Sequence, residues 1–244
     1  MSQRFFSLST RFLVLFLTTL LWPSRLHGGL EVLEAAKHRG SFGLRVTTGI
    51  DETSVATAVG SSFSRLRVRF YLRLDGLDLA EATSATVFTA ENDGPANIAI
   101  QVTRIDGQLR LGWQVRLDNG SFAEVLPPSG PALTAAWHAI ELRWQAGSGD
   151  GSFHLLFDGQ SQMDLDALDN DATLIQSCRL GLIDGDQGTY SGHADFDDFT
   201  WRTEGTIGLL SLDPAELTEP ASQWPERHSI LYLIGLVSEI RTSP

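Results

Sequence analysis

The stretch from Leu168 to Trp201 reads LDNDATLIQSCRLGLIDGDQGTYSGHADFDDFTW, and it decides the fold class. Two apolar segments, 175–183 and 194–201, flank a loop rich in glycine, aspartate and serine. The second segment alternates with the period of a strand. One face would hold Phe196, Asp198 and Thr200, and the other Asp197, Phe199 and Trp201. The stretch therefore predicts two strands joined by a glycine-rich turn.

The chain before this stretch repeats the pattern of short strands separated by turns. The clearest strand is 65–74, and others are predicted at 30–46 (a pair), 55–59, 85–90, 98–104, 109–117, 138–146, 153–157 and 160–163. Asp106-Gly107 and Asp158-Gly159 are typical two-residue hairpin turns. No helical period occurs before residue 210. These observations predict an all-β fold, a two-sheet antiparallel sandwich.

Several strings occur in a characteristic order along the chain. They are GSFGLRV at 40–46, WHAIEL at 137–142, the Asp158-Gly159 hairpin, LDND at 168–171, RLG at 179–181 and FDDF at 196–199. Together they resemble the laminin-G-like branch of the concanavalin A-like lectin/glucanase superfamily, as found in secreted bacterial proteins. The resemblance covers about 30–203 and implies a jelly-roll sandwich. Because lectins, hydrolases and plain spacers share this fold, it says less about function.

The two ends of the chain differ from the sandwich. Arg4 and Arg11 precede the apolar run Phe12–Trp22, which predicts a secretory signal peptide cut before Gly29. The run is too short to span a bilayer. In the tail, Ile230–Val237 predicts a short helix, although a strand fits the same pattern. We expect a signal peptide at 1–28, a sandwich at 29–203 and a tail at 204–244. The protein would be secreted, periplasmic or on the cell surface.

The composition limits the partners. Without residues 1–28 the chain has 15 basic and 30 acidic side chains, a net charge of −15. So acidic a surface argues against nucleic acid and anionic membranes. It is compatible with a neutral polysaccharide, a cationic surface protein or bound calcium. Cys178 is the only cysteine, and its place in an alternating strand predicts a buried, inert thiol.

The sequence contains no recognisable catalytic motif. Retaining glycosidases of this fold class resemble one another in a Glu-x-Asp-x-x-Glu strand, which places two glutamates on one face. That string is absent, as is the Gly-x-Ser-x-Gly of serine hydrolases. The histidines have no partner at the short spacing of zinc ligands. We therefore expect a protein that is not an enzyme.

Acidic residues suggest calcium at two places. Asp164, Asp166, Asp169 and Asp171 form an acidic string, but the glycine and glutamate of an EF-hand loop are missing, so a solvated loop is expected. The family resemblance implies another site, because related sandwiches hold one structural calcium between the first strand and an aspartate of the last. Asp197 matches that aspartate, although the usual glutamate-containing opening before the first strand is missing.

The strand at 65–74 supplies the candidate ligand-binding residues. Its apolar residues point to one side, so Arg67, Arg69, Tyr71 and Arg73 must line an outer, solvated surface. They are either a solvated face whose arginines pair with nearby acids or a ligand-binding face, since arginine and aromatic planes bind sugars and anionic polymers. Trp113 and Trp144 turn inward by the same alternation and are assigned to the core.

Two hypotheses of different classes follow. The leading one is a secreted, non-catalytic, lectin-like module that binds carbohydrate or another surface ligand through Arg67, Arg69, Tyr71 and Arg73. The alternative is a structural or adhesion spacer whose C-terminal segment docks a protein partner.

Overall fold

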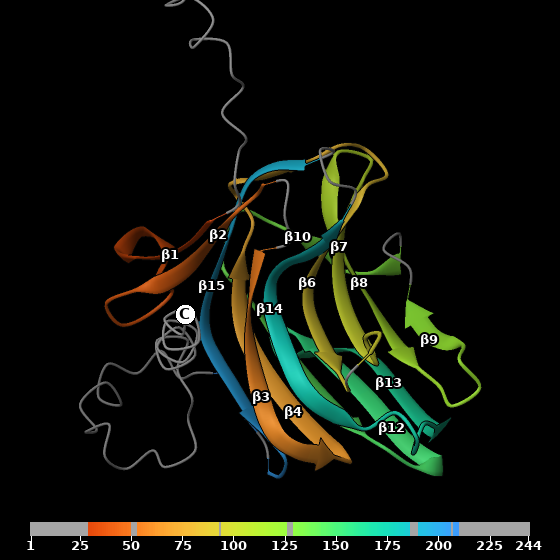
Figure 1. Cartoon of the computed structure of the whole chain (residues 1–244). Coiled ribbons are helices and arrows are strands. Elements are labelled where there is room, and N and C mark those ends of the chain that lie inside the picture. Colours follow the sequence, from red (N-terminus) through yellow and green to blue (C-terminus); the bar gives the residue numbers. More distant parts are fainter. Residues whose placement is uncertain are drawn as a thin grey trace, which may run out of the picture.

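The computed structural model describes residues 29–49, 53–92, 94–125, 129–185, 190–205 and 207–209, which form two packed β-sheets (Figure 1). The elements are β1 (Gly29–Leu33), the 3₁₀ helix η1 (Glu34–Ala36), β2 (Gly43–Thr47), β3 (Thr53–Phe63), β4 (Arg65–Arg73), β5 (Leu77–Leu79), β6 (Ser84–Glu91), β7 (Ile98–Ile105), β8 (Gln108–Arg116), β9 (Phe122–Val125), β10 (Ala132–Leu133), β11 (His138–Gln145), β12 (Ser148–Phe157), β13 (Gln160–Asp169), β14 (Ile175–Gly185) and β15 (Tyr190–Arg202). The predicted signal peptide and tail helix lie outside the described residues. None of the described helical residues forms a span long and apolar enough to cross a membrane.

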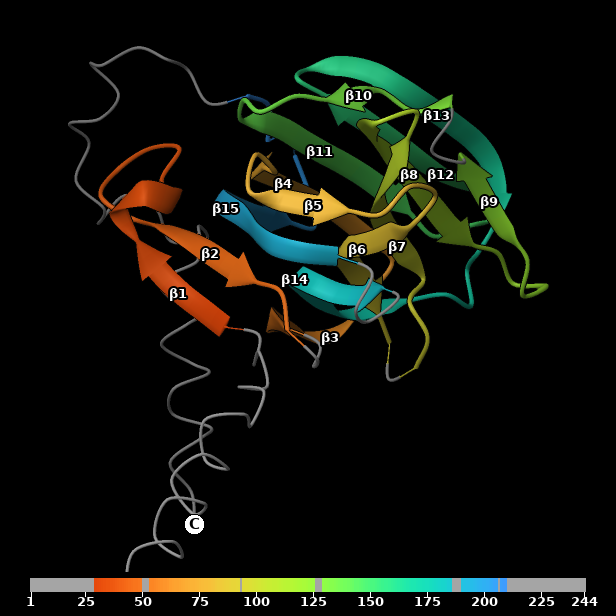
Figure 2. The same cartoon turned by 90° about the horizontal axis from the view of Figure 1, so that it is seen from above.

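The chain passes repeatedly between the two sheets. The eight-stranded sheet has the order β1-β2-β15-β4-β11-β12-β13, with β5 paired to β15. The seven-stranded sheet has the order β10-β8-β7-β6-β14-β3, with β9 paired to β8. Neighbouring strands among the described residues pair antiparallel, and Figure 2 shows the β1–β2 hairpin at one side of the molecule. The predicted two-sheet antiparallel sandwich is confirmed.

The core lies between the sheets and consists of inward-facing alternate residues. Phe70 of β4 stacks on Phe88 of β6 with 5.6 Å between ring centroids, which joins the two sheets. Trp113 and Trp144 are 3% and 2% exposed and Cys178 is 1% exposed, so the predicted burial of all three is confirmed. Burial also raises the pKa of the Cys178 thiol, which keeps it protonated and unreactive.

The hairpin turns follow from the local sequence. At Asp106-Gly107 the φ angles are 51° and 73°, and at Asp158-Gly159 they are 51° and 78°. A type I′ hairpin needs positive φ at both central residues, which glycine and aspartate tolerate better than other residues. These turns fix the pairing of β7 with β8 and of β12 with β13.

The closing strand β15 departs from the alternation predicted for it. Asp197 lies opposite Tyr71 of β4 and Thr200 opposite Arg69, so β15 holds one extra residue between these pairs. Asp198 has a φ of 50° there and marks a β-bulge. Because of the extra residue, Phe196 and Phe199 both face the core. The prediction that they lie on opposite faces is wrong for this reason.

Candidate functional site

The four residues predicted to bind a ligand lie along β4, on the side of the eight-stranded sheet turned away from the core, here termed the outer face. Arg67 and Arg73 are partly exposed. Only 3% of Arg69 and 7% of Tyr71 is exposed. The expectation of a solvated surface is therefore wrong for Arg69 and Tyr71, because two segments from distant parts of the chain cross over them.

The first covering segment runs from η1 to β2. The His38 ring stacks on the Tyr71 ring, with 3.9 Å between centroids and 16° between planes. Asp197 Oδ2 accepts the backbone N–H of His38 at 2.7 Å and of Arg39 at 3.0 Å. His38 Nδ1 also lies 3.1 Å from Asp198 Oδ2. The two aspartates of β15 thus hold this loop on the outer face, and the loop buries Tyr71.

Asp197, the residue matched to a calcium ligand, has backbone partners on both oxygens. Its Oδ1 accepts the N–H of Asp198 at 2.7 Å, in addition to the two N–H groups on Oδ2. Burial raises the pKa of Asp197, and the N–H groups of Arg39 and His38 act in the opposite direction. Among the described residues, Asp197 belongs to no group of three metal-ligating side chains. The protein itself satisfies this carboxylate, and calcium at Asp197 stays a prediction.

The second covering segment, residues 207–209, crosses β4 and β11. The carbonyl of Gly208 accepts Arg69 Nη1 at 2.5 Å, and its N–H donates to Glu141 Oε2 at 3.0 Å. Leu209 lies against Gly159, where an added Cβ would come within 2.9 Å of Leu209 Cδ1. Arg69 and Glu141 are direct cross-strand neighbours, each 3% exposed. The segment therefore closes the middle of the outer face.

Arg73 belongs to a buried ionic network centred on Asp195. Arg45 Nε and Nη2 donate to Asp195 Oδ1 and Oδ2 at 2.7 and 2.9 Å, and Arg73 Nη2 donates to Oδ2 at 2.5 Å. Burial alone would raise the pKa of Asp195, but the hydrogen bonds from Arg45 and Arg73 outweigh it, so its pKa lies below the usual aspartate value. The Arg73 guanidinium also lies 4.9 Å from the centroid of the Trp137 ring. These contacts hold the Arg73 side chain in place and give it a structural role.

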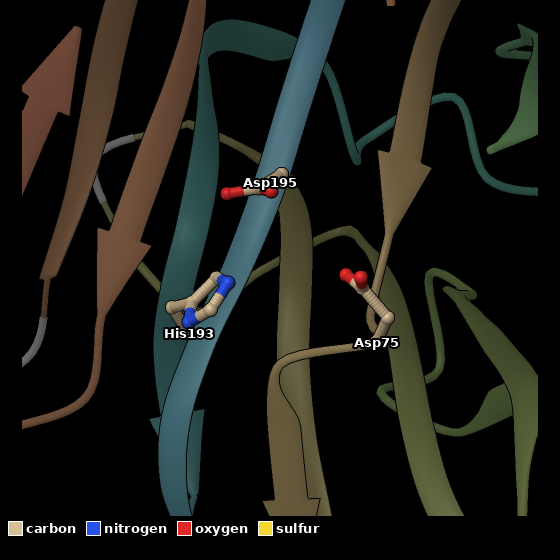
Figure 3. Close-up of side chains that lie close together, drawn as sticks. All are labelled: Asp75, His193 and Asp195. Atoms are coloured by element: carbon tan, nitrogen blue, oxygen red, sulfur yellow. The ribbon is translucent and has the colours of Figure 1, made fainter. Parts of the chain in front are cut away.

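Asp75 and His193 lie beside Asp195 and form with it a group of potential metal ligands. Figure 3 shows Asp195 and His193 on β15, with Asp75 facing them from the turn after β4. The His193 ring packs on Gly76, where an added Cβ would lie 2.1 Å from the ring. Since both Asp195 oxygens already accept hydrogen bonds from arginines, a metal ion here would face two guanidinium groups. The local charge therefore opposes a cation.

A second acidic group, Asp118, Asp169 and Asp171, lies on the surface. Asp169 and Asp171 belong to the acidic string for which a solvated loop was expected. That expectation is wrong for Asp164, Asp166 and Asp169, which lie in the strand β13. The Asp118 carboxylate accepts the N–H of Ala172 at 3.1 Å. Burial and then a hydrogen bond with Asp171 raise the pKa of Asp118. These contacts explain the cluster as a turn-stabilising arrangement.

Three arginines lie in one line across the outer face. Arg202 of β15 is directly opposite Arg67 of β4, and Arg67 is directly opposite Arg143 of β11. Arg65, the preceding residue on the same face of β4, is exposed. These four residues are termed the arginine row. The sequence analysis identified only Arg67 as a site residue, because the pairing of strands so distant in sequence leaves no local signal.

Another arrangement that resembles a catalytic group involves His138. Its Nδ1 lies 2.8 Å from Asp158 Oδ2, and its Nε2 lies 2.9 Å from Thr134 Oγ1. However, Nε2 also accepts the backbone N–H of Thr134 at 3.0 Å. A base that activates a hydroxyl needs its lone pair for the proton. Since the backbone N–H already occupies that lone pair, the arrangement stabilises the turn before β11.

Comparisons with known proteins place the fold but no family. No protein-family model matches the sequence, and no curated protein matches it. Among solved structures, the cellulose-induced protein Cip1 is similar with a TM-score of 0.55 and 15% identity, over 77% of this chain and 91% of that chain.

Two further similar structures have different descriptions. The alginate lyase from Klebsiella pneumoniae matches with a TM-score of 0.51 and 10% identity, over 77% of this chain and 88% of that chain. The binding domain of botulinum neurotoxin DC, in complex with rat synaptotagmin II, matches with a TM-score of 0.50 and 8% identity, over 75% of this chain and 43% of that chain. The chain therefore has the concanavalin A-like jelly-roll sandwich, a fold shared by enzymes and binding proteins.

Proposed function

We propose that this chain is a secreted, non-catalytic, lectin-like module of the laminin-G-like kind. It binds carbohydrate or another surface ligand on the outer face of the eight-stranded sheet. The observation that carries the proposal is the concentration of arginine on this face of an acidic chain. The arginines are Arg45, Arg65, Arg67, Arg69, Arg73, Arg143 and Arg202. Guanidinium groups bind sugar hydroxyls and anions through several donors held in one plane.

The four predicted binding residues have two kinds of role in this proposal. Arg67 is partly exposed and contacts the ligand directly. Arg69, Tyr71 and Arg73 support the surface from below, because Gly208 and the loop before β2 lie over Arg69 and Tyr71. Arg73 holds Asp195 in place. Mutation of these three would therefore act on the shape of the face.

The hydrogen bonds of two carboxylates on the outer face, Glu141 and Asp195, support binding without catalysis. Glu141 Oε1 accepts Arg143 Nε and Nη2 at 3.0 and 2.9 Å, and its other oxygen accepts Gly208 N–H. Asp195 is buried between Arg45 and Arg73. A general acid or base must come within hydrogen-bond reach of the substrate. Both carboxylates have protein partners instead. Two of the similar structures, a cellulose-induced protein and an alginate lyase, support a polysaccharide as the ligand.

A glycan array probed with the mature chain tests the proposal. We expect binding to at least one glycan class, and no new reducing ends or unsaturated sugars after long incubation with that glycan. New products would overturn the non-catalytic assignment. A chain that binds no glycan on the array would favour the structural or adhesion spacer, in which the C-terminal segment docks a protein partner.

A further inference from the structure

Most guanidinium groups of the arginine row have no acidic partner in the described part of the chain. Across the described residues, Arg65, Arg67 and Arg202 form no hydrogen bond or ion pair through their side chains. Arg143 shares the carboxylate of Glu141 with Gly208. Arg143 also attracts the carboxylate of Asp164 on β13. Among the described residues, acids thus pair with Arg143 alone of these four guanidinium groups.

Such a row is costly without an outside partner. Like charges that lie directly opposite on neighbouring strands destabilise a sheet, and Arg202 and Arg67 are such a pair. The chain holds 30 acidic residues against 18 basic ones, so an acidic neighbour at this place would be easy to supply. Elsewhere on the same face the chain does supply one, since Asp195 lies between Arg45 and Arg73.

We propose that the arginine row binds a polyanionic glycan through carboxylate or sulfate groups. This inference rests on the proposed function and names its ligand class. Neighbouring strands are about 4.8 Å apart, so Arg202, Arg67 and Arg143 span about 10 Å. A single small anion can contact only part of that length. A polymer with a charge on successive sugars contacts all three strands, and each guanidinium can take two oxygens of one charged group.

The overall charge of the chain sets the limits of this binding. A net charge of −15 repels any polyanion at a distance, which disfavours a nucleic acid with its dense phosphates. At physiological ionic strength charges are screened beyond about 8 Å, so the arginines in contact outweigh distant acids. The net charge alone is compatible with a neutral polysaccharide, a cationic surface protein or calcium, and it does not choose among them. The distribution of charge on the outer face favours an acidic polysaccharide.

Binding of the mature chain to dextran sulfate, dextran and polygalacturonate tests the inference. Dextran and dextran sulfate share one backbone and differ only in sulfate. We expect binding to dextran sulfate or polygalacturonate, none to dextran, and weaker binding as salt is raised. Arg67→Gln and Arg202→Gln should each weaken binding about tenfold. Arg116→Gln is the matched control, because Arg116 is also partly exposed and without a side-chain partner in the described residues but lies on the seven-stranded sheet.

Thermal melting of the same variants distinguishes a ligand-binding role of the arginine row from a role in stabilising the fold. If the row awaits a ligand, Arg202→Gln relieves repulsion and melts at or above the wild-type temperature at low salt. A lower melting temperature would show that Arg202 already stabilises the fold through contacts within the chain, and would overturn the inference. Equal binding to dextran and dextran sulfate would overturn it too, while the proposed function would stand. Failure to bind any of the three polymers would overturn the inference, and failure on the glycan array as well would also count against the proposed carbohydrate binding.

Discussion

Replacement of Asp195 by asparagine removes the centre of the ionic network on the outer face. Asp195 is fully buried, and removal of one partner of a buried ion pair costs about 3–5 kcal/mol. Arg45 and Arg73 keep 22% of their side-chain surface exposed, and Arg73 retains Asp75 at 3.3 Å. Water and Asp75 therefore compensate in part for the lost carboxylate. We expect the free energy of unfolding to fall by about 3 kcal/mol, the lower end of that range. For a domain of this size that lowers the melting temperature by about 6–12 °C.

Thermal and urea denaturation of Asp195→Asn over a range of pH tests this reasoning. The pKa of Asp195 is lowered in the folded chain. Its contribution to stability is therefore fully present above the ordinary aspartate pKa of about 3.9 and is lost as the pH falls through the lower folded pKa. The difference between wild type and variant should be largest near neutral pH and should narrow in strong acid. Asp78→Asn is the control, because its ion pair with Arg104 has an 80% exposed carboxylate and contributes little. A neutral-pH difference below about 2 °C, or one unchanged in acid, would refute the reasoning.

Four further outcomes are expected. Trp113→Ala and Trp144→Ala should each cost about 3–5 kcal/mol by urea denaturation; melting within a degree or two of wild type would contradict their core positions. Calcium added to chelator-stripped protein should raise the melting temperature if Asp197 is a ligand, since an ion bound only by the folded state stabilises it, and no shift at millimolar calcium would end that idea. N-terminal sequencing of exported protein should begin near Gly29 rather than at Met1. Iodoacetamide should modify Cys178 only after unfolding, because its thiol is buried and its pKa raised.

The fold was predictable wherever its determinants are local. The alternation in Arg65–Arg73 and the Asp158-Gly159 turn each lie within a few residues, and the structure confirms both. The bulge at Asp198 was not predictable in the same way. Its string FDDF also fits regular alternation, and the extra residue becomes visible only through the pairing of β15 with β4.

The site was predictable in part. Alternation places Arg67, Arg69, Tyr71 and Arg73 on the outer face correctly. Their exposure depends on which segments cross that face. His38 comes from a loop early in the chain and Gly208 from the segment after the last strand. Neither contact leaves a pattern around β4, so a local argument could not separate Arg67 from its buried neighbour Arg69.

On the outer face, the arginines that other segments bury are also the ones that have hydrogen-bond or ion-pair partners. A buried guanidinium without an acceptor costs far more than an exposed one, because it loses its water. Accordingly, Arg69 has the carbonyl of Gly208 above it, and Arg73 has Asp195 beside it. Arg67 and Arg202 lie at the other end of the face, partly exposed and without a carboxylate partner within the described residues. Because both side chains are partly exposed, a charged ligand can reach them there. The covered centre therefore holds the surface in shape, and the exposed end is where an anion gains most by binding.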